Sequence, residues 1–190
     1  MQDFMDQAAK NGVDLLNKGR CQFCGADYQR GIFECMENYN NGLLLFDFND
    51  SKNHLYRFLS VDAHALQHPE IHGRWSNHFH LTRLHLILQK KQISDYNKSP
   101  RLSDYLNKYK SNKPNEFLKA PAPLDRGIIT AKDLTMVTTA EECAELISKW
   151  ADEVYYAWNS NHGTVAEIAE GFLANYYNET TQGRKTMKYK

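Results

Sequence analysis

Apolar residues recur at intervals of three and four along most of this 190-residue chain, and this spacing is the strongest constraint on its fold. Such spacing places apolar side chains on one face of an α-helix, whereas a half-buried strand requires strict alternation. Few segments alternate in this way, and glycine-rich turns are scarce. The sequence therefore predicts a mainly α protein, a bundle of four or five helices with a long irregular crossover and an N-terminal cysteine turn.

Proline, glycine and polar residues mark where the predicted helices begin and end. Ser76 is a good N-cap for one helix, and Glu141 and Glu142 suit the first turn of another, where the helix dipole is positive. The helices are expected over residues 1–16, 35–49, 51 or 54 to 68, 76–91, 102–110, 139–160 and 164–177.

The length of the chain indicates one domain, because 190 residues bury a real core but would be cramped as two independent folds. We expect a single helical domain over residues 1–177, with the cysteine turn at 18–36 and the crossover at 92–137. The remaining residues, 178–190, are almost free of apolar side chains and carry four basic ones, so we expect a basic flexible tail.

Charge and hydropathy narrow the classes of partner. The chain has 23 basic and 23 acidic residues, so no global positive field exists to gather nucleic acid or an anionic membrane. No apolar run approaches the roughly 20 residues that span a bilayer, and the N-terminus lacks the basic-then-apolar order of a secretory signal. We expect a cytoplasmic protein without nucleic-acid or membrane partners, acting on an unknown small molecule or protein. Its oligomeric state does not follow from the sequence.

Three of the four cysteines lie close together. Cys21 and Cys24 have the two-residue spacing that lets both sulfurs bind one tetrahedral Zn²⁺, and Gly25 lets the backbone turn over the ion. Cys35 follows in the same region, but a fourth ligand must come from elsewhere. Reduced thiols in a turn and a thioredoxin-like redox pair are the alternatives. Cys143 shares a helical face with apolar residues and is expected in the core.

Histidine is also clustered, because seven of the eight lie between residues 54 and 85. Such clustering suggests metal ligands or a proton-transfer site. His80 falls on the apolar face of its predicted helix, as a core histidine also would, and Asp62 falls in the middle of the apolar face of the helix before it. A buried unpaired carboxylate costs on the order of several kcal/mol, so Asp62 must pair with a cation, keep a proton, or orient a histidine or metal ligand. A helix cap or a helix–helix hydrogen bond is the alternative.

Topology predicts which of these residues meet. Consecutive helices joined by short turns usually lie antiparallel, so the cysteine turn, Cys35, the end of one helix at His68 and the start of the next at His80 would share one end of the bundle. An antiparallel return of the helix over 139–160 would bring His162 there. We therefore predict a Zn²⁺ site with six candidate ligands, Cys21, Cys24, Cys35, His68, His80 and His162.

Other polar and aromatic residues are expected outside this site. Asp62 would lie about 9 Å deeper than His68, six residues at a rise of 1.5 Å, which is too far for a ligand. His54 is expected at the far end of the bundle, and His64 and His72 on the surface. On the helix over 139–160, Trp150 and Trp158 face the core, whereas Tyr155 and Tyr156 face outward.

Five motifs together resemble an uncharacterised bacterial protein family, and the resemblance covers most of the chain: CQFCG at 21–25, EC at 34–35, VDAHALQH at 61–68, HL at 80–81 and WADEVYYAWNSNH at 150–162. It implies a cytosolic single-domain protein in which all six candidate ligands and Asp62 match in type. His64 stands where the family has Tyr, so the resemblance gives it no role. A weaker similarity is to DinB-like helical bundles, whose members can carry a histidine-held metal and act as thiol-dependent transferases or hydrolases.

Three functions remain open, and the sequence does not establish whether the protein is an enzyme. The first is a structural Zn²⁺ that ties the N-terminal part of the chain to the bundle and needs no open coordination position. The second is a metal-dependent hydrolase or thiol-dependent transferase, in which Asp62 and His80 are the catalytic proton-transfer groups. The third is a regulatory or adaptor module that uses exposed tyrosines and the basic tail.

Overall fold

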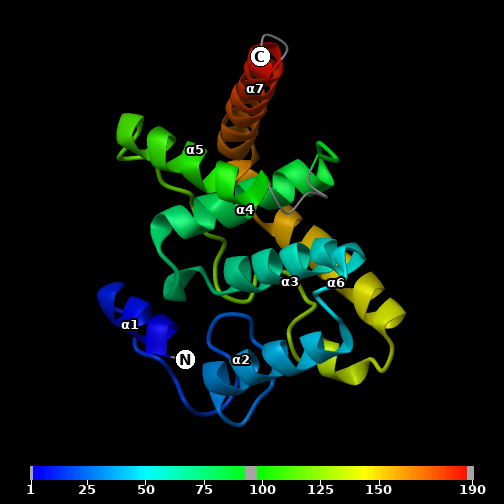
Figure 1. Ribbon diagram of the computed structural model, residues 1–190. Coiled ribbons are helices and arrows are strands. Elements are labelled where there is room, and N and C mark those ends of the chain that lie inside the picture. The colour runs from blue at the N-terminus through cyan, green and yellow to red at the C-terminus, as the bar shows by residue number, and fades with distance from the viewer. Residues whose placement is uncertain (1, 93–97, 188–190) are drawn as a thin grey trace.

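A computed structural model describes residues 2–92 and 98–187 of the chain (Figure 1). Within these ranges the chain forms seven α-helices and no strand, which confirms the predicted mainly α fold. The helices are α1 (Gln2–Lys10), α2 (Gly31–Gly42), α3 (His54–Gln67), α4 (Arg74–Leu88), α5 (Lys98–Asn112), α6 (Ala140–Ala157) and α7 (His162–Met187). None of the helices in the described ranges combines the length and the apolar character that a bilayer-spanning segment needs.

Helices α3 and α4 organise the packing. α3 packs against α4 and α6, and α4 also packs against α5 and α7. Figure 1 shows α1 and α2 at one end of the molecule, with α5 and α7 at the other. The short 3-10 helix η3 (Pro69–Ile71) joins α3 to α4, so the end of α3 lies next to the start of α4.

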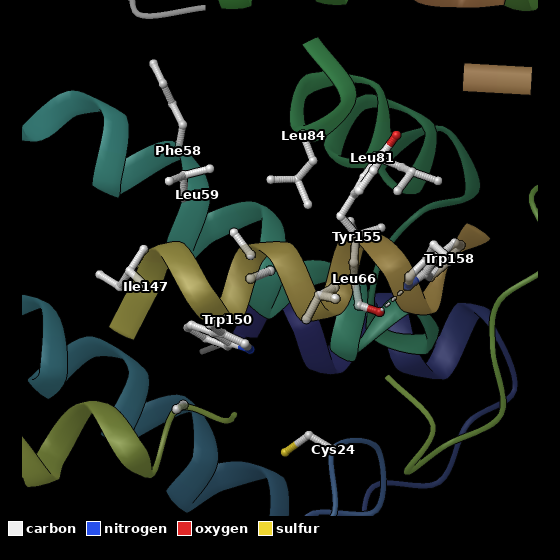
Figure 2. Packing of buried hydrophobic residues seen from close by; sticks show 14 of the residues in the cluster. Cys24, Phe58, Leu59, Leu66, Leu81, Leu84, Ile147, Trp150, Tyr155 and Trp158 are labelled. Atoms are coloured by element: carbon white, nitrogen blue, oxygen red, sulfur yellow. Dashed lines mark hydrogen bonds between the residues drawn. The ribbon is translucent and has the colours of Figure 1, made fainter. Parts of the chain in front are cut away.

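The core is built around two tryptophans, one in α6 and one at the C-cap of that helix. Trp150 and Trp158 are fully buried, as predicted, and Trp158 Nε1 donates to the Leu66 carbonyl of α3 at 3.1 Å (Figure 2). Tyr156 is exposed, as predicted, but the prediction for Tyr155 was wrong, because Tyr155 is 2% exposed. α6 packs against both α3 and α4, so it buries a wider face than a helix with one neighbour.

Local chemistry sets the helix ends. Thr139 caps α6: its side chain accepts the Glu142 N–H at 3.2 Å, and the Glu142 carboxylate accepts the Thr139 N–H at 3.2 Å. α4 begins at Arg74 instead of Ser76, because Gly73 takes the extended N-cap conformation and its carbonyl accepts the Ser76 N–H. α7 continues through Met187, beyond the predicted end at residue 177, since no proline interrupts it.

The loop between α5 and α6 wraps around the C-terminal end of α3. Arg126 in this loop is 1% exposed, and it donates to the Gln67 carbonyl at 3.0 Å and to the Glu70 carboxylate. Gln67 in return donates from Nε2 to the Ile129 carbonyl at 2.8 Å. These buried hydrogen bonds hold the loop beside the cysteine turn, where the Leu124 N–H donates to the Phe23 carbonyl.

Candidate metal centre

Cys21 and Cys24 lie in a tight turn that its own backbone stabilises. The Cys21 N–H donates to the Ala26 carbonyl, and the Gly25 N–H donates to the Cys21 carbonyl, both at 2.9 Å. Gly25 has a φ of +77°, and a Cβ there would stand 2.7 Å from the Leu124 side chain. Glycine is therefore favoured at this position for its conformation, and a larger residue would also displace the Leu124 side chain.

Two helices bring the other members of the site to this turn. Cys35 lies in the second turn of α2, and His68 is the C-cap residue of α3. The first residue of α2, Gly31, has a φ of +54°, and a Cβ there would stand 2.3 Å from the Leu16 carbonyl oxygen. Its N–H donates to the Gly19 carbonyl at 2.9 Å, which fixes how the chain enters α2.

The four side chains form one compact group, the Cys3His group (Cys21, Cys24, Cys35 and His68). Their ligand atoms all lie within 4.8 Å of one another. The Cys24 and Cys35 sulfurs are 3.8 Å apart, and His68 Nε2 lies 3.5 Å from the Cys21 sulfur and 3.4 Å from that of Cys35. In a tetrahedron with Zn–S near 2.3 Å and Zn–N near 2.0 Å, these edges would be about 3.8 and about 3.5 Å. The arrangement can therefore hold a single metal ion.

A hydrogen bond fixes which nitrogen His68 presents to the sulfurs. His68 Nδ1 lies 2.6 Å from the His64 carbonyl oxygen, and because a carbonyl only accepts, Nδ1 carries the proton. Nε2 is therefore the nitrogen that faces the cysteines, and in the neutral ring it presents its lone pair to them. A metal-binding histidine is oriented in this way, with its other nitrogen bonded to a carbonyl or carboxylate.

His64 supports His68 through its ring as well as its backbone. The two imidazoles stack at a centroid distance of 4.2 Å, and Tyr39 of α2 stacks on His64 at 4.2 Å. The prediction of His64 on the surface was wrong: it is 4% exposed because Tyr39 lies over it. Burial lowers the pKa of His64 well below its ordinary value, so this ring is neutral against its neighbour.

The electrostatics of the Cys3His group treat two of its cysteines in opposite ways. Hydrogen bonds with Cys24 and Cys35 lower the pKa of Cys21 well below its usual range, whereas hydrogen bonds with Cys21 and Cys24, together with burial, raise the pKa of Cys35 well above it. Burial lowers the pKa of His68, but its contacts with Cys21 and Cys24 outweigh burial and raise it to about 10. The protein side chains by themselves therefore stabilise negative charge on Cys21 but not on Cys35, and a bound cation would favour the metal-binding thiolate form at all three sulfurs.

Residues 19–159 match the DUF5946 family, a family of unknown function. The chain belongs to the DUF5946 family. No curated protein and no solved structure matches it significantly. The matched range contains all four residues of the Cys3His group.

A second buried polar cluster in this DUF5946 protein, the Asp62 cluster, consists of Asp62, His80 and Arg83. Asp62 is fully buried and accepts from Arg83 Nε at 2.8 Å, from Arg83 Nη2 at 2.6 Å and from His80 Nδ1 at 2.7 Å. The Arg83 guanidinium lies between the rings of Phe58 and Phe79, 4.6 and 4.7 Å from their centroids. Asp62 thus pairs with a cation and orients a histidine.

Two of the six predicted ligands lie outside the Cys3His group. His80 is six residues after the start of α4, so it lies about 9 Å from the turn between α3 and α4, level with Asp62 rather than with His68. His162 begins α7, where its ring stacks on Tyr155 at 4.0 Å and its Nε2 lies 2.9 Å from the Tyr155 carbonyl oxygen. Its imidazole is thus held at the end of α6.

The structure also tests the predicted positions of Cys143, His54 and His72. Cys143 is fully buried in the core, as predicted, and its thiol donates to the Gly42 carbonyl at 3.6 Å. His54 lies at the start of α3, the end opposite His68, as predicted. His72 is partly buried, whereas the sequence predicted it on the surface, and burial lowers its pKa to about 3.

Two arginines of this DUF5946 protein were missed by the sequence analysis. Arg83 is the cation that Asp62 requires, and its position three residues after His80 puts both on one side of α4, which is a usable signal. Arg126 lies in an irregular loop without periodicity, so no local pattern points to its burial against Glu70.

An open pocket lies over the cysteine turn. Its volume is about 560 Å³, and the residues around it include Cys21, Cys24, Leu124 and Ile128. Cys24 is 7% exposed, whereas the other three members are at most 1% exposed, so Cys24 is the member of the Cys3His group nearest to solvent. The pocket provides a path by which an ion can reach the ligands.

Proposed function

We propose that this DUF5946 protein binds one structural Zn²⁺ through the Cys3His group. The observation that supports this proposal is the agreement between the S···S and S···N distances of 3.8, 3.5 and 3.4 Å and the edges of a zinc tetrahedron. Three thiolates and one imidazole are soft ligands that favour Zn²⁺ over Mg²⁺ or Ca²⁺. Ligand atoms within 4.8 Å of one another suit one ion better than a larger cluster.

The ion is structural in this proposal because four protein ligands complete its coordination shell. A catalytic zinc keeps a position for water, usually with three protein ligands. The four side chains are between 0 and 7% exposed, and none of them stands apart from the others as a displaceable ligand. A metal-dependent hydrolase that acts through this ion is therefore less well supported than a structural site.

The ion would attach the N-terminal arm, residues 11–30, to the helices. The arm has no α-helix, and it is held by hydrogen bonds, such as Gln22 Nε2 to the Asp14 carbonyl at 2.9 Å, and by the burial of Phe23 and Tyr28 in the core. Zinc bound to the arm through Cys21 and Cys24, and to α2 and α3 through Cys35 and His68, would add its binding free energy to the stability of the fold.

The proposed setting follows from the same chemistry. Thiolates bind metal only where they stay reduced, so we place the protein in a reducing compartment. With 23 basic and 23 acidic residues, the proposal gives no role to nucleic acid or to a membrane.

Metal content and a matched pair of cysteine variants test the proposal. Untagged protein purified under reducing conditions should contain one Zn²⁺ per chain by elemental analysis. Cys35→Ser should lose the ion, whereas Cys143→Ser should retain it. Both thiols are 0% exposed, so the pair separates loss of a ligand from loss of a buried cysteine.

His68→Gln provides a second comparison, with His162→Gln as its control. Only His68→Gln should lose zinc, because only His68 belongs to the Cys3His group. Wild-type protein that neither contains zinc nor binds it when added in excess would refute the proposal. Equal zinc content in Cys35→Ser and Cys143→Ser would refute the assignment of the ligands.

A further inference from the structure

The Asp62 cluster has one member that reaches the surface. The side chain of Asp62 is 0% exposed and that of Arg83 is 7% exposed, whereas that of His80 is 12% exposed. The carboxylate therefore lies behind the imidazole, and solvent meets the cluster at His80. This order, a buried carboxylate behind a more exposed histidine, is the order of a catalytic Asp–His pair.

The hydrogen bonds fix the protonation of His80. Arg83 donates to both oxygens of Asp62, so the carboxylate acts only as an acceptor. His80 Nδ1, 2.7 Å from Oδ1, must then carry a proton, and in the neutral ring the lone pair lies on Nε2. The two aromatic rings around Arg83 shield the ion pair from water, which strengthens these bonds.

Holding α3 against α4 does not require the histidine. Arg83 alone joins the two helices through two hydrogen bonds to Asp62. The bond from His80 adds a third, and its further consequence is to fix the ring so that Nε2 has a defined direction. An imidazole fixed in this way is prepared to accept a proton.

A second imidazole lies beside His80. The His72 ring is inclined to it, at a centroid distance of 5.9 Å, and His72 Nε2 is buried without a hydrogen-bond partner among the residues described here. Asn11 Nδ2 donates to the His72 carbonyl at 3.1 Å and holds this part of the chain in place. A small polar molecule bound next to His80 would give this buried nitrogen a partner.

We propose that His80 is a catalytic base for the hydrolysis of small activated esters, independent of the metal centre. His80 Nε2 takes a proton from water as the water oxygen bonds to the ester carbonyl carbon. The bond between the acyl carbon and the alcohol oxygen then breaks, the alcohol leaves with the electron pair, and His80 returns the proton to it. Asp62 is a positioning residue that holds the ring. Because His80 is only 12% exposed, the acyl group must be small.

Ester hydrolysis by the full, zinc-loaded chain tests this proposal with p-nitrophenyl acetate as the probe. His80→Gln should lower the rate about 100-fold, within the range for loss of a general base. His162→Gln removes an imidazole that stacks on Tyr155 and should leave the rate unchanged. The ratio of the hydrolysis rate of the bulkier p-nitrophenyl trimethylacetate to that of p-nitrophenyl acetate should be lower with the wild type than with free imidazole. Equal and small losses in the two histidine variants would overturn the proposal.

The role of Asp62 has its own readout. Asp62→Asn keeps His80 but replaces the carboxylate, so kcat should fall at least tenfold with KM little changed. An unchanged kcat in a folded variant would overturn the positioning role. If Asp62→Asn does not fold, labelling of wild-type protein with diethyl pyrocarbonate, mapped by mass spectrometry, decides instead. His80 should be labelled faster than His162, and slower labelling of His80 would overturn the proposal.

Discussion

The Cys3His group and the Asp62 cluster are two buried polar clusters that share helix α3, and they satisfy their polar atoms in opposite ways. In the Asp62 cluster, the oxygens of one acid accept three hydrogen bonds from Arg83 and His80, so the protein itself balances the buried charge. In the Cys3His group, three thiols and one ring nitrogen face one another, with no lysine or arginine among them.

The difference shows which buried polar cluster requires something from outside the chain. A carboxylate bonded to a guanidinium and an imidazole is complete. Three sulfurs and a nitrogen at tetrahedral spacing gain more from a metal cation than from one another. Removing one partner from each cluster in turn tests this difference between them.

Removal of the metal should have the largest effect. Zinc-loaded protein treated with a chelator should lose at least about 5 kcal/mol of stability, since structural zinc contributes on the order of 10 kcal/mol in small domains. For a chain of this size, the melting temperature should fall by about 10 to 20 °C. Scanning calorimetry at fixed protein concentration measures this. Identical melting curves with and without chelator would contradict the claim that the Cys3His group, unlike the Asp62 cluster, requires a cation.

Asp62→Ala should have the next largest effect. It leaves Arg83 buried at 7% exposure without its carboxylate, which should cost about 3 to 5 kcal/mol in urea denaturation. The double variant Asp62→Ala with Arg83→Met should recover part of this loss, because no buried charge remains. The loss should be the same in zinc-loaded and chelated protein. A loss that disappears on chelation would mean that the two clusters depend on each other.

Low pH should lower the stability of the fold through His72, the histidine beside the Asp62 cluster. Burial lowers the pKa of His72 to about 3, whereas an unfolded histidine titrates near 6.5. The folded state then binds fewer protons, so the stability from neutral His72 is present above pH 6.5 and is lost as pH falls from 6.5 toward 3. Between pH 7 and pH 4.5 this should amount to about 2 to 3 kcal/mol.

The His72→Gln variant measures that contribution by difference. Its loss of stability between pH 7 and pH 4.5 should be smaller than that of the wild type, while His162→Gln should lose as much as the wild type. Because the three proteins share the Cys3His group, its own pH dependence cancels. Equal slopes for the wild type and His72→Gln would contradict the buried, neutral state of His72.

Thr139→Ala should have the smallest effect and provides a scale for the others. It removes the side-chain acceptor that caps α6, a helix that contributes no member to either cluster, and should cost about 1 kcal/mol in urea denaturation. Metal content should be unaffected. A cost that exceeds that of Asp62→Ala would show that helix capping matters more than the buried ion pair.

Much of the fold was predictable because it depends on neighbours in sequence. The core positions of Trp150 and Trp158 follow from helical spacing, and the start of α6 follows from the residues around Thr139. The inward position of Asp62 was predictable for the same reason. Helix ends were less predictable: α4 begins two residues early because Gly73 is its N-cap, and this moved His80 deeper along the helix.

The site was predictable in part. The spacing of Cys21 and Cys24 indicated a shared ion, and Cys35 and His68 were both expected beside it. The choice among three histidines could not be made from local pattern, because it depends on how far each one lies from a helix end. His64 was assigned to the surface because its burial is due to Tyr39, a residue of another helix.

The sequence by itself determined the helices, the paired cysteines and the need for a partner at Asp62, since each follows from spacing along one segment or from the cost of burying a charge. Tertiary structure alone decided that His68 joins the cysteines, that His80 joins Asp62 and that Arg126 binds Glu70. The physical reason is that periodicity fixes the face on which a side chain lies, whereas its partner is fixed by the register between helices and by the path of the loops.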